Sequence, residues 1–162
     1  MPITATPDAV LHACEEAGLT LVTAESCTGG MVCAALTDIA GSSKVVLGGV
    51  VSYSNGLKQG LLGVTTDTLK THGAVSEETA QEMASGALKT SGADLAVAIT
   101  GIAGPGGSET KPEGRVCFGL ARRDQPVFHE TIEFGALGRE NVRAASCAHA
   151  LGLLLAGANG EL

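Results

Sequence analysis

The 162-residue sequence is poor in aromatic side chains, which make up 2% of it, with no Trp, three Phe and one Tyr. A core of stacked rings is therefore excluded, and Val, Leu, Ile and Ala must fill the interior. Positive charge is also scarce, because 10 Lys and Arg face 17 Asp and Glu, giving a formal net charge of -7. Nucleic acids and anionic membranes are bound through concentrated positive charge, so neither is expected as a partner.

Long apolar runs and paired cysteines are missing as well. No run reaches the ~18 residues of a membrane-spanning helix, and the first residues lack the basic and apolar segments of a signal peptide. The sequence therefore predicts a cytoplasmic protein. The five cysteines show no C-x-x-C spacing, which favours neither a disulfide framework nor a metal centre. We expect no metal and no cofactor.

Helical and strand patterns alternate along a globular composition that is 44% hydrophobic and 17% charged. Helices are predicted over 7–17, 28–39, 55–62, 76–91 and 139–156, and strands over 19–24, 44–54, 94–100, 114–122 and 127–134. Gly48-Gly49 predicts a bulge or bend in the second strand. We expect residues 1–162 to form one three-layer α/β/α domain with a mixed sheet of five to six strands.

The stretch 20–30 is the first candidate site, because a predicted strand ends there in a polar corner before a helix. Ser26 at this corner is either an N-cap or a nucleophile, and residue type alone favours the cap. Thr28 weakens that interpretation by offering a second hydroxyl. Gly29 and Gly30 let a ligand approach the backbone, and free amides at a helix N-terminus favour anions.

A nucleophilic serine requires a base. Three of the four histidines lie within predicted helices or strands and His72 alone lies in a loop, so a Ser-His-Asp triad has little support. Lys58, just after the only tyrosine, Tyr53, is the alternative, provided that burial or nearby positive charge lowers its pKa. The competing interpretation is a solvated helix lysine, and spacing alone does not place Lys58 beside Ser26.

A second candidate region is the glycine-rich loop 101–114, which follows a buried strand. Its amides can form a nest for a phosphate or an oxyanion, although a plain flexible loop is the alternative. Its glycines match neither the dinucleotide fingerprint nor the P-loop. Arg139 and Arg143, one turn apart on the last helix, either clamp a phosphate or decorate the surface.

Taken together, these motifs resemble the CinA C-terminal domain family. They occur in order over nearly the whole chain, so the resemblance is specific, although no single piece would be. The matching motifs are Ala-Glu-Ser-Cys-Thr-Gly-Gly at 24–30, Ala-Gly-Ser-Ser at 40–43, Tyr-Ser-Asn at 53–55 with Lys58, His-Gly-Ala-Val-Ser-Glu-Glu at 72–78, Gly-Ile-Ala-Gly-Pro at 101–105, Gly-Gly-Ser at 106–108 and Lys-Pro-Glu-Gly at 111–114.

The family is similar to nicotinamide-nucleotide amidohydrolases, which convert nicotinamide mononucleotide (NMN) to nicotinate mononucleotide and ammonia in pyridine-nucleotide salvage. Some members carry an N-terminal domain resembling molybdopterin-binding proteins, and this chain resembles the stand-alone form. The resemblance implies that Ser26 attacks the carboxamide, Lys58 accepts its proton and Tyr53 positions or relays it.

The resemblance also implies a set of substrate contacts for a small nucleotide. Amides around Thr28-Gly29-Gly30 or Thr100-Gly101 would hold the oxyanion. The other candidates for substrate binding are Asn55, Gly104, Gly107, Ser108 and Arg143.

Two alternatives stay open. The domain can instead be a non-catalytic nucleotide-binding or regulatory module linked to competence or the DNA-damage response, with Ser26 only as a cap. Cys27 is a second candidate nucleophile, which requires a positive neighbourhood to form a thiolate. A further alternative, an interaction domain for another protein, has no sequence feature of its own, and a homo-oligomer also stays open.

Overall fold

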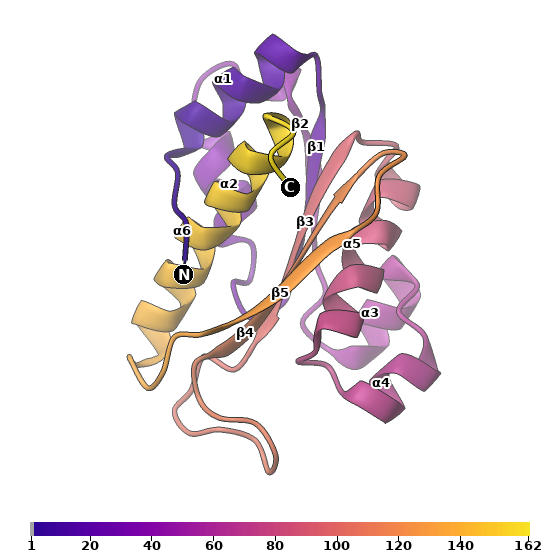
Figure 1. Ribbon diagram of the computed structural model, residues 1–162, viewed down its shortest axis with the longest axis vertical. Helices are drawn as coiled ribbons and strands as arrows, with labels where there is room; N and C mark the ends of the chain where they lie inside the picture. Colours follow the sequence, from indigo (N-terminus) through magenta and orange to yellow (C-terminus); the bar gives the residue numbers. More distant parts are fainter. Residues whose placement is uncertain (1) are drawn as a thin grey trace.

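The computed structural model describes residues 2–162, so Met1, the first residue of the predicted domain, lies outside the described residues. Five strands form one mixed sheet in the order β2-β1-β3-β4-β5 (Figure 1). β1 is parallel to β2 and β3, whereas β3 and β5 are both antiparallel to β4. The strands are β1 Leu21–Glu25, β2 Val46–Val51, β3 Leu95–Gly101, β4 Arg115–Arg122 and β5 Phe128–Glu133.

Helices cover the two faces of this sheet. The group α1, α2 and α6 packs together on one face, and α3, α4 and α5 pack on the other (Figure 1). The predicted three-layer α/β/α fold is therefore confirmed. The helices are α1 Pro7–Ala17, α2 Met31–Thr37, α3 Asn55–Leu62, α4 Thr66–His72, α5 Glu77–Ser91 and α6 Arg139–Ala158.

Two hydrophobic cores fill the spaces between the layers. The larger lies under α1, α2 and α6 and includes the fully buried Leu21 and Phe118. The smaller, under α5, is built largely from alanine. Small residues also bring α3 close to α5, because a Cβ added at Gly86 would lie 1.8 Å from the Leu62 carbonyl oxygen. Close approach of backbones thus compensates for the scarcity of large aromatic side chains.

Several predicted boundaries are confirmed by their local geometry. The Ser76 side chain caps α5 by accepting from the Thr79 amide, and Gly92 ends that helix in the left-handed conformation. The β1–β2 register shifts between Leu21 and Val22, which confirms the irregularity predicted for the second strand.

Other boundaries differ from the prediction. From the sequence, no element is assigned to residues 63–75, and His72 is placed in a loop. The structure has α4 there, capped by the Thr65 hydroxyl, with His72 as its last residue. The helix predicted from residue 28 begins only at Met31, because Gly29 and Gly30 have φ of +59° and +104°. Left-handed residues interrupt a helix, so the corner after β1 is a turn.

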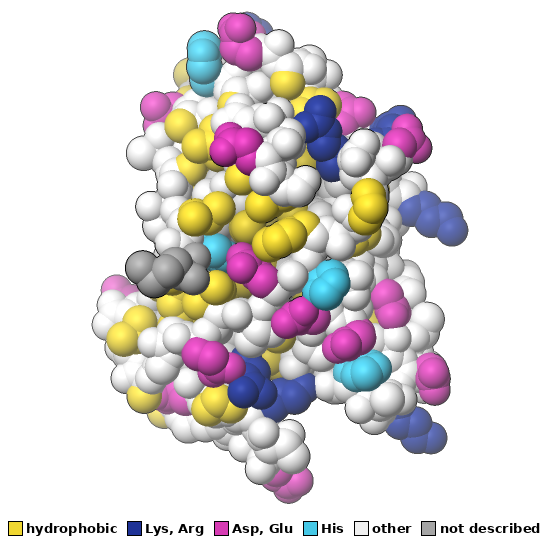
Figure 2. All heavy atoms as spheres, in the orientation of Figure 1, with side chains coloured by type: hydrophobic (Ala, Val, Ile, Leu, Met, Phe, Trp, Pro, Cys, Tyr) yellow, Lys and Arg dark blue, Asp and Glu magenta, His cyan; other side chains and the backbone are white. Residues whose placement is uncertain are grey.

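The parallel pairing brings three loops to one edge of the sheet. β1, β2 and β3 all end at this edge, and the loops that follow them meet there, as ligand-binding loops do in α/β folds. Acidic side chains are spread over the face shown in Figure 2, in keeping with the net charge of -7. None of the helices in residues 2–162 combines the length and apolar character needed to cross a membrane.

Candidate active site

Ser26 stands directly after β1, at the edge where the three loops meet. Its amide donates to the Ile99 carbonyl on β3 at 2.9 Å, which extends the strand pairing by one residue and fixes the backbone. The residue is only 7% exposed. The N-cap residue of α2 is Gly30 and no side chain caps it in the usual way, so the interpretation of Ser26 as a helix cap is wrong.

The N-terminus of α2 is occupied by Glu25, a residue that the sequence patterns did not single out. This carboxylate is fully buried and accepts five hydrogen bonds. Three come from backbone amides in the first turn of α2, where a negative group is favoured. The donors are Thr23 Oγ1 (3.2 Å), Thr28 Oγ1 (2.7 Å) and the amides of Gly30 (3.2 Å), Val32 (3.0 Å) and Cys33 (3.0 Å).

This arrangement corrects the expectation that amides of the glycine corner are free for an anion. The Gly30 amide donates to Glu25, and the Gly29 amide donates to the Ser26 carbonyl at 3.0 Å. Among the described amides of residues 26–30, only those of Cys27 and Thr28 donate to no other residue. The dipole and the glycine amides therefore act within the protein, and they fix the turn that carries Ser26.

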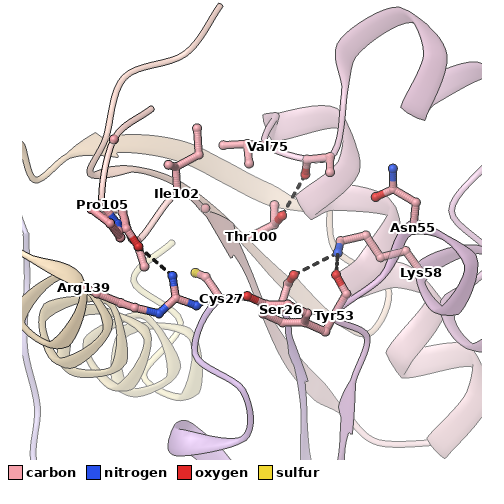
Figure 3. Close-up of a pocket in the computed structure, with 15 residues that line it drawn as sticks. Ser26, Cys27, Tyr53, Asn55, Lys58, Val75, Thr100, Ile102, Pro105 and Arg139 are labelled. Atoms are coloured by element: carbon pink, nitrogen blue, oxygen red, sulfur yellow. Dashed lines mark hydrogen bonds between the residues drawn. The ribbon is translucent and has the colours of Figure 1, made fainter. Parts of the chain in front are cut away.

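Lys58 lies on α3, and its side chain extends to Ser26 (Figure 3). Ser54 begins α3 by accepting from the Leu57 amide at 3.2 Å, and this places Lys58 on the first turns of the helix. Its Nζ lies 2.8 Å from Ser26 Oγ, 2.8 Å from the Ser52 carbonyl oxygen and 3.1 Å from that of Tyr53. The side chain is 1% exposed, so Lys58 is not a solvated helix lysine.

The Ser52 and Tyr53 carbonyls determine which kind of hydrogen bond Lys58 can make to Ser26. A neutral primary amine has two N–H groups and one lone pair, and a carbonyl oxygen can only accept. A neutral Lys58 donates its two N–H groups to the carbonyls of Ser52 and Tyr53. Its lone pair then accepts a hydrogen bond from the Ser26 hydroxyl. Burial lowers the pKa of Lys58 below its ordinary value of 10.5, which favours this neutral form. No carboxylate in residues 2–162 lies in salt-bridge range of Lys58 to oppose the shift.

Tyr53 contributes through its backbone and its ring separately. Its carbonyl accepts from Lys58, whereas its hydroxyl accepts from Arg139 Nη2 at 3.1 Å. The residue is 61% exposed at the rim of the site. Within the described residues the hydroxyl makes no hydrogen bond to Ser26 or Lys58, so this geometry favours positioning over proton relay.

A cavity of about 340 Å³ opens over the serine. Ser26 and Lys58 lie side by side in its lining (Figure 3), together with the loops that follow β1, β2 and β3, the segment 74–75 between α4 and α5, and Arg139 of α6. The lining residues are Ser26, Cys27, Tyr53, Asn55, Lys58, Ala74, Val75, Thr100, Gly101, Ile102, Ala103, Gly104, Pro105, Gly106 and Arg139.

Only one of the two arginines of α6 reaches the cavity. Arg139 lines the cavity, where its Nη1 donates to the Gly104 carbonyl at 2.6 Å. Arg143 lies outside the lining and donates to the carbonyls of Cys27 at 3.0 Å and Thr28 at 3.3 Å. The structure thus brings Arg139 to the cavity in place of the predicted Arg143, whose guanidinium braces the Ser26 turn.

The other predicted substrate contacts divide in the same way. Asn55, Thr100, Gly101 and Gly104 line the cavity. The Thr100 hydroxyl is engaged within the protein, because it donates to the Ala74 carbonyl at 2.7 Å. The predicted residues that the structure places outside the lining are Thr28, Gly29, Gly30, Gly107, Ser108 and Arg143.

Part of the cavity wall was not identified from the sequence. Ala74 and Val75 belong to the 72–78 motif that contributes to the family resemblance, and that motif was the available signal. Ile102 and Ala103 follow β3 within the predicted glycine-rich loop. Apolar residues of this kind carry no chemical signature, so only the fold shows that they face Ser26.

Cys27 lines the cavity but lacks the features of a nucleophilic thiol. Burial raises the pKa of its thiol to about 12, and the nearby Arg143 guanidinium does not offset that rise. The thiol is therefore protonated at neutral pH, and a protonated thiol is a weak nucleophile. Across residues 2–162, no cluster of three or more His, Cys, Asp or Glu has an arrangement suited to a metal ion.

The fold and the site together define a class: an α/β domain that buries a hydrogen-bonded serine–lysine pair at the carboxyl edge of its parallel strands. The chain belongs to the CinA C-terminal domain family, whose sequence model matches residues 4–157. It is 54% identical over 139 residues to a CinA-like protein of Mycolicibacterium gilvum (strain PYR-GCK), covering 85% of this chain and 33% of that protein.

A putative competence-damage inducible protein of Symbiobacterium thermophilum is 47% identical over 157 residues, covering 91% of this chain and 37% of that protein. The chain therefore spans about a third of the length of these curated relatives.

Solved structures match over nearly their whole length. The competence/damage inducible protein CihA from Agrobacterium tumefaciens superposes with a TM-score of 0.89 at 46% identity, covering 96% of this chain and 98% of that one. A competence-damaged protein (CinA) superfamily protein from Klebsiella pneumoniae 700603 gives a TM-score of 0.89 at 37% identity, covering 96% and 99%. These matches support the three-layer fold.

Proposed function

We propose that this domain hydrolyses the carboxamide of NMN to give nicotinate mononucleotide and ammonia. The observation that carries the proposal is the 2.8 Å contact between Lys58 Nζ and Ser26 Oγ, with both hydrogens of the neutral amine donated to backbone carbonyls. The family resemblance suggests the substrate. A cavity of about 340 Å³ falls within the usual range for small-molecule sites, about 300–1,000 Å³.

The proposed reaction proceeds in two halves. Ser26 Oγ attacks the carboxamide carbon while its proton passes to the neutral amine of Lys58. The tetrahedral intermediate collapses as the Lys58 ammonium returns that proton to the leaving nitrogen, so ammonia departs and an ester to Ser26 remains. Water then attacks the ester carbon as Lys58 accepts one of its protons. The bond to Ser26 Oγ breaks as the Lys58 ammonium returns that proton to Oγ, so the acid product leaves with Ser26 and neutral Lys58 restored.

The developing oxyanion requires donors that are not already engaged. The Cys27 amide follows the nucleophile, lines the cavity and donates to no other residue, so we assign it as the first donor. This replaces the assignment to Gly29 and Gly30. Tyr53 positions Lys58 through its carbonyl and Arg139 through its hydroxyl.

Arg139 is the proposed partner of the substrate phosphate, because it is the cavity's only guanidinium among the described residues. Replacing it by methionine is expected to raise KM for NMN by about 10- to 100-fold, the effect of losing a hydrogen bond to a charged group, with a smaller change in kcat. Steady-state kinetics at constant ionic strength will measure the split.

Arg143→Met is the matched comparison for this prediction. Arg143 lies one turn away on α6 and donates to two carbonyls of the Ser26 turn. We expect this variant to lower the unfolding temperature and to leave KM closer to wild type. A large rise in KM for Arg143→Met, together with an unchanged KM for Arg139→Met, would show that the phosphate lies at the other arginine.

Ammonia release from NMN tests the proposed function as a whole. Wild-type protein should release ammonia and nicotinate mononucleotide in equal amounts, and Ser26→Ala should release neither above background. The Thr37→Ala variant, changed on the exposed end of α2, serves as the control and should behave as wild type. If wild type binds NMN but all three proteins are inert, the domain is a nucleotide-binding module and the catalytic proposal fails.

A further inference from the structure

The segment 72–75, which joins α4 to α5, is held by side chains at every one of its carbonyls. Residues 73–75 lie in neither a helix nor a strand, so the position of this segment depends on those donors. Ala74 and Val75 form one wall of the cavity over Ser26. The acceptor–donor pairs are His72–Lys111 (2.6 Å), Gly73–Ser76 (2.9 Å), Gly73–Thr79 (2.8 Å), Ala74–Thr100 (2.7 Å) and Val75–Lys111.

Two of these hydrogen bonds come from one side chain on the opposite wall. Lys111 belongs to the long loop between β3 and β4, which projects from the end of the sheet in Figure 1. The first residues of that loop, including Ile102 and Gly104, form the facing wall of the cavity. Lys111 Nζ therefore joins the two walls, across 39 residues of sequence to His72 and 36 to Val75.

Thr100 holds Ala74 to the end of β3, but among the described residues only Lys111 links the segment to the loop beyond β3. Among the hydrogen bonds of residues 2–162, those of Lys111 are the only ones that connect the 102–114 loop to the segment 72–75. Lys111 forms no salt bridge with any described carboxylate, so the two carbonyls are its polar partners. The hydrogen bond to the His72 carbonyl is exposed and the one to the Val75 carbonyl is half-buried. A charged donor makes the half-buried bond one of the stronger kinds of hydrogen bond in proteins.

The backbone beside Lys111 is adapted to it. Gly73 has φ of +82°, and a Cβ added there would lie 3.1 Å from Lys111 Nζ. A side chain at this position would crowd the ammonium group, so glycine leaves room for the lysine to reach past it. The Lys-Pro-Glu-Gly motif at 111–114 thus has a place in the structure that the proposed chemistry does not account for.

We propose that Lys111 is a positioning residue that holds the two walls of the cavity together around the substrate. Without it, the segment 72–75 and the loop 102–114 separate, and the substrate loses contacts that the walls provide. The Ser26–Lys58 pair is held by other elements and stays intact. The kinetic part of this inference rests on the proposed function, whereas the structural part does not.

Hydrogen–deuterium exchange tests the structural part directly. Replacing Lys111 by methionine keeps the length of the side chain and removes its donors. We expect amide exchange in peptides covering 72–76 and 102–110 to quicken by about tenfold or more, as local opening becomes easier. Lys89→Met, an exposed lysine of α5 with no hydrogen-bond partner among the described residues, is the control and should leave both peptides unchanged.

Kinetics of NMN hydrolysis test the consequence for the site. Lys111→Met should raise KM about tenfold while kcat stays within about twofold, and Lys111→Arg, which keeps a cationic donor, should recover most of the wild-type KM. Any of three results would overturn the inference. These are unchanged amide exchange in Lys111→Met, a fall in its kcat without a rise in KM, and a KM for Lys111→Arg that does not return toward wild type. If wild type does not hydrolyse NMN, the proposed function fails, and exchange alone still decides the role of Lys111.

Discussion

Replacing Lys58 by methionine is expected to lower kcat for NMN hydrolysis by at least about 10³-fold, the scale of losing the base that activates a serine. Methionine fills much the same volume and brings no charge into the buried site, so the folded protein should persist. Lys70→Met, changed at an exposed lysine of α4, should retain wild-type kcat. Ammonia release under saturating NMN measures the difference.

The pH dependence of kcat/KM gives an independent check on the same lysine. Only the neutral amine can accept the Ser26 proton, so activity should fall as pH falls through the folded-state pKa of Lys58. Burial lowers that pKa below 10.5, so the acid limb should lie at lower pH than an ordinary lysine would give. An acid limb at or above 10.5 would contradict a neutral Lys58, as would near-normal turnover in Lys58→Met.

Replacing Glu25 by glutamine is expected to lower the free energy of unfolding by about 3–4 kcal/mol. The two carboxylate oxygens together accept five hydrogen bonds, and three of these bonds come from amides at the start of α2. Glutamine substitutes an NH₂ group for one oxygen, and this places a donor against donors in a fully buried site. Urea unfolding followed by circular dichroism measures the loss.

Glu16→Gln is the matched control for Glu25→Gln. Glu16 is exposed on α1 and forms no hydrogen bond or salt bridge among the described residues, so its replacement should change stability by less than about 0.5 kcal/mol. Turnover should also fall in Glu25→Gln, since Ser26 follows Glu25 in the chain. Equal stability of the two variants would mean that Glu25 does not hold the turn.

Much of the fold follows from the sequence, because its signals are local. Alternating patterns indicate the strands, the Ser76 and Gly92 caps bound α5, and the double glycine marks the irregularity of β2. The exception is α4, a seven-residue polar helix without a buried residue. Such a helix has no hydrophobic face to reveal it, and its Thr65 cap is a weak signal.

The pairing of Ser26 with Lys58 could not be derived from spacing. The two residues are 32 apart in sequence, and their contact depends on the β1–β2 register and on where α3 begins after β2. The family resemblance implies the pairing, and the structure shows its geometry. The carbonyls of Ser52 and Tyr53, which fix the direction of the lone pair, are backbone atoms that no motif records.

The sequence also does not determine which of Arg139 and Arg143 lines the cavity. The two side chains share one side of α6, and only the packing of α6 against the Ser26 turn decides which one reaches the cavity. The role of Glu25 is similar. A glutamate at a strand end suggests exposure, whereas here the first turn of α2 folds back over it.

The central claim, that Ser26 is the nucleophile, is tested most directly by trapping the covalent intermediate. Protein mixed with NMN is quenched in acid during the first turnovers, digested and analysed by mass spectrometry with fragmentation across residues 26 and 27. We predict the acyl group of nicotinate mononucleotide on Ser26, present in Cys27→Ala and absent from Ser26→Ala. An acyl group on Cys27, or undiminished turnover by Ser26→Ala, would contradict the account.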